Sequence, residues 1–169
     1  MSEIIPSNRL LSTHNPGHES FFLDSYRLLC HFLASPHIAK LENELEGRKF
    51  RGFYEKQEIS RLLINIASRF RVKSDDGEWY DSAVASSKIP NVGELYKDVS
   101  GEEDLVPLEL REACNKIIHA KKVHFDCDDD GNSDGLNPVI YLYGNKGSKE
   151  WKATLDIAKF CTAALNVVV

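Results

Sequence analysis

The sequence lacks the motifs that mark the common classes of enzyme and membrane protein. It has no glycine-rich phosphate-binding loop, no G-x-S-x-G nucleophile elbow and no H-E-x-x-H zinc motif. No stretch approaches the roughly 20 apolar residues that a membrane-spanning helix needs. The first residues, MSEIIPSNRL, show no basic segment followed by an apolar run. We therefore expect neither a membrane span nor a secretory signal.

Cysteine is scarce and scattered, which argues against a zinc ribbon or a disulfide framework. No C-x-x-C pair occurs among the four cysteines, Cys30, Cys114, Cys127 and Cys161. Reduced thiols in the cytoplasm are the simplest interpretation.

What is present is the composition of one globular domain. The 169 residues are 42% hydrophobic and 28% charged, and the net charge of −5 disfavours indiscriminate binding to nucleic acid. The charge is uneven, because residues 48–73 are strongly basic and residues 74–112 are strongly acidic. Either the two segments neutralise each other in the fold, or the basic segment binds an anionic partner such as RNA.

Apolar periodicity predicts a mainly α fold, a helical bundle of four to five helices with a small β-hairpin before the last helix. Residues 1–17 form an irregular arm, and residues 18–169 form a single helical domain. We expect Ser35-Pro36 to end one helix and begin another. The expected helices cover residues 21–34, 36–46, 54–72, about 101–121 and 149–166, with a loop at 74–101 and the hairpin at 122–144.

Three polar residues form the strongest candidate site. Arg111, Asn115 and His119 are spaced by four residues, so they form one row on the expected helix. The row lies opposite the apolar stripe formed by Leu110, Ala113, Cys114 and Ile117. It is therefore a binding site, a helix-packing surface or an ordinary solvated face.

The segment REACNKIIH, from Arg111 to His119, resembles the Arg…His motif of HEPN-type helical proteins. The resemblance implies a four-helix core, a homodimer, and metal-independent ribonuclease activity of the kind found in toxins and defence systems. His119 would transfer a proton at the scissile phosphodiester, and Arg111 would offset phosphate charge beside Asn115. The seven intervening residues exceed the usual family interval and separate Arg111 and His119 by about 12 Å along the helix. Two chains would then be needed to complete one site.

The expected hairpin loop carries a second candidate, with the pattern D-x-D-x-D-G. Its carboxylates are Asp126, Asp128, Asp130 and Asp134, and such a cluster can surround Ca²⁺. The twelfth position is Asn137 instead of the bidentate glutamate, and strands flank the loop where an EF-hand has helices. The alternative is a solvated acidic loop without metal.

The leading hypothesis is a cytoplasmic, HEPN-like protein that binds or cleaves RNA, with no cofactor unless the acidic loop holds Ca²⁺. The alternative is a non-catalytic module that binds another protein through its polar helix face and acidic loop.

Overall fold

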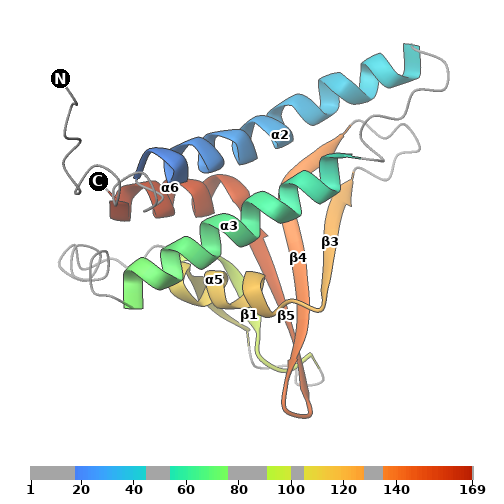
Figure 1. Cartoon of the computed structure of the whole chain (residues 1–169). Helices are drawn as coiled ribbons and strands as arrows, with labels where there is room; N and C mark the ends of the chain where they lie inside the picture. Colours follow the sequence, from blue (N-terminus) through green and yellow to red (C-terminus); the bar gives the residue numbers. More distant parts are fainter. Residues whose placement is uncertain (1–17, 45–53, 76–90, 100–104, 128–134, 169) are drawn as a thin grey trace, which may run out of the picture.

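The computed structural model describes residues 18–44, 54–75, 91–99, 105–127 and 135–168 (Figure 1). These residues form four helices and five strands. In chain order the elements are α2 (His18–Glu44), α3 (Lys56–Asp75), β1 (Asn91–Tyr96), β2 (Leu105–Glu109), α5 (Leu110–His119), β3 (Lys122–Cys127), β4 (Leu136–Lys146), β5 (Lys149–Asp156) and α6 (Ile157–Val168).

The strands form one antiparallel sheet in the order β2-β1-β5-β4-β3. The prediction of a mainly α helical bundle is therefore wrong, and the fold is α+β. The hairpin expected at 122–144 is confirmed as the β3–β4 pair. It is, however, only one edge of a larger sheet.

The main error concerns residues 149–156, which we expected to begin the last helix and which form β5. In this strand Trp151, Ala153 and Leu155 are buried, while the alternate residues are partly exposed. Successive side chains of a strand point to opposite faces of the sheet, so a strand with one buried face shows this alternation. Gly147, at φ +63°, begins the two-residue turn that joins β5 to β4. Such turns favour glycine because they need a positive φ.

The other two strands lie where we expected a loop and the start of a helix. β1 falls within the 74–101 segment, and β2 occupies 105–109. Pro107 fits β2 because this strand lies at the edge of the sheet, where a missing N–H is tolerated. The helix that carries the polar row is consequently shorter than expected and begins at Leu110.

The expected break at Ser35-Pro36 is also absent, because α2 continues through Pro36. Ser35 is fully buried, and its Oγ accepts a hydrogen bond from the backbone N–H of Leu136 (2.9 Å) instead of capping a helix. Gly135, at φ +113°, lies against the same turn, and a Cβ at this position would stand 2.4 Å from the nitrogen of Pro36. The start of β4 is thereby joined closely to the middle of α2.

The prediction for α3 is confirmed. Its expected apolar face is buried along its whole length, at Ile59, Leu62, Leu63, Ile66, Ala67 and Phe70.

All four described helices lie on one face of the sheet (Figure 1). A single core cluster joins them to the inward residues of the strands, including Ile140, Leu142 and Trp151. The outward residues of the central strands are only partly buried. Among the described residues, no helix is both long and apolar enough to cross a membrane.

Candidate functional site

The polar row of α5 lies against α3, where two of its three members have partners. Arg111 donates to Asp75 Oδ1 at 2.7 Å, and Arg71 donates to Asp75 Oδ2 at 3.0 Å. Arg71 also donates to the side-chain oxygen of Asn115. The arginines hold the pKa of the Asp75 carboxyl below its ordinary value, the bond from Arg111 contributing most. Arg111 and Asn115 therefore belong to a network that joins α5 to α3.

The network continues along α5 through Glu112. Asn115 Nδ2 donates to Glu112 Oε2 (3.0 Å), and Lys116 Nζ lies 3.2 Å from Glu112 Oε1. Burial alone would raise the pKa of Glu112, but the bonds from Asn115 and Lys116 bring it below its ordinary value. The row thus has the features of a helix-packing surface, one of the interpretations drawn from the sequence.

His119 is the last residue of α5 and is exposed. Asp75 holds Arg111 at the other end of the helix, about 12 Å away along the axis. Within one chain, Arg111 and His119 are therefore not brought to one phosphate. Their joint role across a homodimer stays a prediction.

The basic segment at 48–73 is largely paired where the structure describes it. Arg61 bonds Glu58, Arg69 bonds Asp24 at 3.1 Å, and Arg71 bonds Asp75. Residues 48–53 lie outside the described part of the chain. The described arginines thus favour neutralisation within the fold over a free basic face for RNA.

Most of the predicted calcium loop lies outside the described residues, namely Asp128, Asp130 and Asp134. Asp126, in β3, is partly buried and accepts a hydrogen bond of 3.4 Å from Asn137 Nδ2. No group of three or more metal-ligating side chains occurs within the residues that the structure describes.

The outward face of the sheet offers a different candidate site. Two rows of paired residues cross all five strands on this face. The first row runs, from β2 to β3, through Leu105, Tyr96, Lys152, Tyr143 and Lys122. The second runs through Pro107, Glu94, Thr154, Tyr141 and His124. We call these ten residues the open sheet face.

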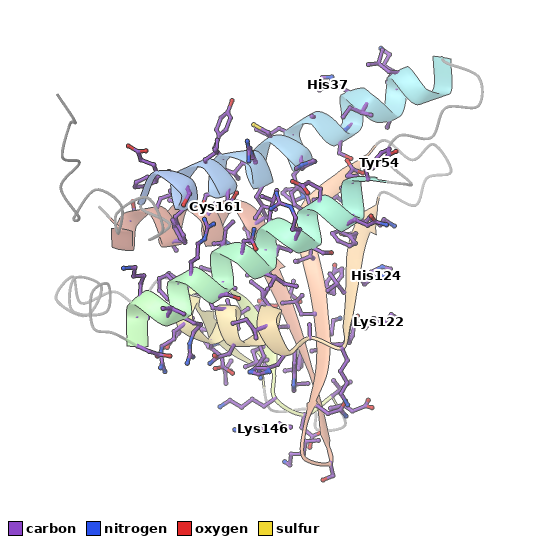
Figure 2. The ribbon with its side chains drawn as sticks, in the orientation of Figure 1. His37, Tyr54, Lys122, His124, Lys146 and Cys161 are labelled. Atoms are coloured by element: carbon purple, nitrogen blue, oxygen red, sulfur yellow. The ribbon has the colours of Figure 1, made fainter. Side chains whose placement is uncertain are left out.

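Tyrosine rings and lysine ammonium groups alternate on the open sheet face. Lys152 Nζ lies 4.9 Å from the ring centre of Tyr141 and 6.0 Å from that of Tyr143. Lys122 Nζ lies 6.0 Å from the Tyr143 ring, and the rings of His124 and Tyr141 are 6.1 Å apart. Figure 2 shows Lys122 and His124 projecting from β3 away from the helices.

The local charge of this face is opposite in sign to that of the whole chain. Among its ten residues, Lys122 and Lys152 outnumber the one carboxylate, that of Glu94, whereas the chain as a whole carries −5. Glu150 and Asp156 lie at the two ends of β5, beyond the two rows. Flat aromatic rings beside positive charges can stack with planar groups and neutralise phosphates.

The signal for this site was partly visible in the sequence. Val139–Tyr143 reads as a strand, and its alternation places Tyr141 and Tyr143 on one face. The sequence does not reveal Lys152 as part of this face, because residues 149–156 also fit a helical period. Without β5 there is no central strand to bring Tyr96 alongside the other two tyrosines.

A scan against protein-family models finds no match, and searches of curated proteins and of solved structures also find none.

Proposed function

We propose that the protein binds single-stranded RNA through the open sheet face. The observation that carries the proposal is the row in which Tyr96, Lys152, Tyr143 and Lys122 follow one another on neighbouring strands. Sheet-borne aromatic side chains stack with unpaired bases in several RNA-binding modules, and adjacent cations neutralise the phosphates.

Strand spacing suits the proposed ligand. Neighbouring strands lie about 4.8 Å apart, so residues on alternate strands, such as Tyr96 and Tyr143, are about 10 Å apart. The intervening Lys152 is then placed between two stacked bases, where the connecting phosphate runs. Stacking requires that Lys152 leave the tyrosine rings. The exchange is favourable, because an exposed cation–π contact stabilises by about 0.5–1 kcal/mol and base stacking by about 1–3 kcal/mol.

The proposal concerns binding and does not include cleavage. Cleavage by His119 would need a second group to stabilise the phosphate charge, and Arg111 is paired with Asp75 in this chain. The HEPN resemblance, which rests on α5 alone, stays a prediction together with its homodimer. The alternative hypothesis is a module that binds another protein through the polar face of α5. That face is smaller than expected, because Arg111 and Asn115 already contact α3.

Binding can be measured by fluorescence anisotropy with a labelled ten-nucleotide oligouridine. Tyr143→Ala should raise the Kd about tenfold, because it removes one stacking contact of about 1.4 kcal/mol. Tyr26→Ala is the matched control, since Tyr26 is 65% exposed and lies on α2, outside the sheet. Its Kd should equal that of the unchanged protein. Equal affinities of all three proteins, or no binding by the unchanged protein, would exclude the open sheet face.

The ribonuclease hypothesis is tested separately by incubating the protein with the same RNA in EDTA. We expect the RNA to stay intact. Cleavage that disappears in His119→Ala, with an unchanged Tm, would instead restore the active site inferred from the HEPN resemblance.

A further inference from the structure

A concave site lies on the helix side of the sheet, where α5 meets the end of β1 and the β4–β5 hairpin. Its volume is about 390 Å³. Four lysines from different elements line it, namely Lys97, Lys116, Lys146 and Lys149. Leu95 and Trp151 contribute apolar surface, and among the described residues of the lining Glu112 is the one carboxylate. We call this site the lysine pocket, and Figure 2 shows Lys146 near the tip of the hairpin.

Two of the four lysines are already paired. Lys116 Nζ lies 3.2 Å from Glu112 and 4.3 Å from the ring centre of Trp151, and its side chain is only 11% exposed. Lys149 Nζ lies 3.3 Å from Asp98. Lys116 is therefore a fixed positive charge at the wall of the pocket.

The other two lysines leave the pocket with an excess of positive charge. Within the described residues, neither Lys97 nor Lys146 has a carboxylate within ion-pair distance. Both are exposed and line the same concavity. Several positive charges in one concave surface make the local electrostatic potential more positive, which attracts an anion of equal and opposite charge.

We propose that the lysine pocket binds the phosphate or diphosphate group of a small molecule. Lysine binds phosphate as a compact point charge. The four lysines exceed the two carboxylates that they face, those of Glu112 and Asp98, by two positive charges, which match the charge of one such group. The volume lies within the range of small-molecule sites, about 300–1,000 Å³. Trp151 is 3% exposed, so it forms the floor of the pocket and supports Lys116. The pocket and the open sheet face lie on opposite faces of the sheet, so this proposal does not depend on RNA binding.

The test uses inorganic pyrophosphate as the probe, with thermal unfolding as the readout. Ten millimolar pyrophosphate (a concentration on the order of ten times a millimolar Kd) should raise the Tm by about 3 °C, compared with sodium chloride at equal ionic strength. The double variant Lys97→Gln/Lys146→Gln should lose this rise. Because both lysines are exposed, its Tm without pyrophosphate should stay close to that of the unchanged protein.

The matched control is Lys40→Gln/Lys159→Gln, which removes the same charge from two exposed positions outside the pocket. It should keep the full rise in Tm, and isothermal titration should show saturable binding to this variant and to the unchanged protein only. The proposal is overturned if pyrophosphate has no effect on the unchanged protein. It is equally overturned if both double variants respond alike, since that would reflect the overall charge.

Discussion

Asp75 links two helices by accepting hydrogen bonds from Arg71 of α3 and Arg111 of α5. Its pKa is lower in the folded protein, so its contribution to stability is present above its ordinary pKa of 3.8 and is lost as the pH falls through the lower folded value. Because Asp75 is about half exposed, solvent screens the two ion pairs.

We predict that Asp75→Asn lowers the Tm at pH 7 by a few degrees at most. The difference between the two proteins should shrink as the pH falls below the ordinary pKa of 3.8 and vanish below the lower folded pKa, where both side chains are uncharged. Circular dichroism melts across this range measure it. Glu109→Gln, at an exposed carboxylate of β2, is the control and should change the Tm little at any pH. A difference that does not shrink as the pH falls would contradict an electrostatic role.

The cysteines offer a second prediction at this scale. Burial raises the pKa of the Cys114 thiol and raises that of Cys161 to about 12, whereas Cys30 is only partly buried. Thiolate is the reactive form, so Cys30 should be alkylated by iodoacetamide well before Cys114 and Cys161. Peptide mass spectrometry after timed quenching measures the order. Equal rates in the folded protein would show that the α5–α6 core opens readily.

Among the elements, α2 and β4 are joined by one buried hydrogen bond. Ser35→Ala removes the acceptor of the Leu136 N–H and leaves that donor unpaired in the core. We predict a loss of about 1–3 kcal/mol in the free energy of unfolding, measured by urea denaturation.

Ser60→Ala provides the matched control for this prediction. Its hydroxyl donates a hydrogen bond to the carbonyl oxygen of Lys56, one turn earlier in α3, and the bond is exposed to solvent. This variant should change the free energy of unfolding by less than about 0.5 kcal/mol. If both variants lowered the free energy of unfolding equally, the buried Ser35–Leu136 hydrogen bond would stabilise the fold no more than an exposed one.

The helices show how far periodicity can predict this fold. The apolar face of α3 was predicted residue by residue, because a helix packed on one side displays its period directly. The segment 149–156 was misassigned because Lys152 and Asp156 are spaced by four residues, which also satisfies a helical wheel. Its alternation of Trp151, Ala153 and Leu155 with polar residues fits a strand equally well. Pairing with β1 and β4 decides between them, and no local pattern reveals that pairing.

For the candidate sites too, local patterns could be predicted from the sequence, whereas contacts between distant segments could not. The row on α5 was correctly placed opposite the helix's own apolar stripe. Its partners on α3 could not be inferred, since Asp75 and Arg111 are far apart in the chain and meet only in the fold. The open sheet face depends on five strands in register, so only the part on the β3–β4 hairpin can be predicted from the sequence.

For the molecule as a whole, the net charge of −5 should make RNA affinity weak and sensitive to salt. Each phosphate neutralised on a single strand changes the slope of log K against log salt by about −0.7. If Lys122 and Lys152 each contact one phosphate, Lys122→Gln/Lys152→Gln should make the slope shallower by about 1.4. Anisotropy titrations between 50 and 300 mM salt (roughly the range over which such slopes are linear) measure this.

The double variant Arg27→Gln/Lys40→Gln changes two exposed positions of α2 and has the same net charge, so it should keep the original slope. An identical change in both variants would mean that the overall charge, and not the open sheet face, sets the salt dependence.

The strand order also determines when the sheet can form during synthesis. Of the five described strands, β5 is the last to be made, yet it lies in the middle of the sheet, between β1 and β4. Until it emerges from the ribosome, the nascent chain can hold only two separate ladders, β2–β1 and β4–β3. Such two-stranded ladders are marginal in water. The growing chain therefore carries unpaired strand edges until β5 joins them, and this interval is when it most needs protection from aggregation.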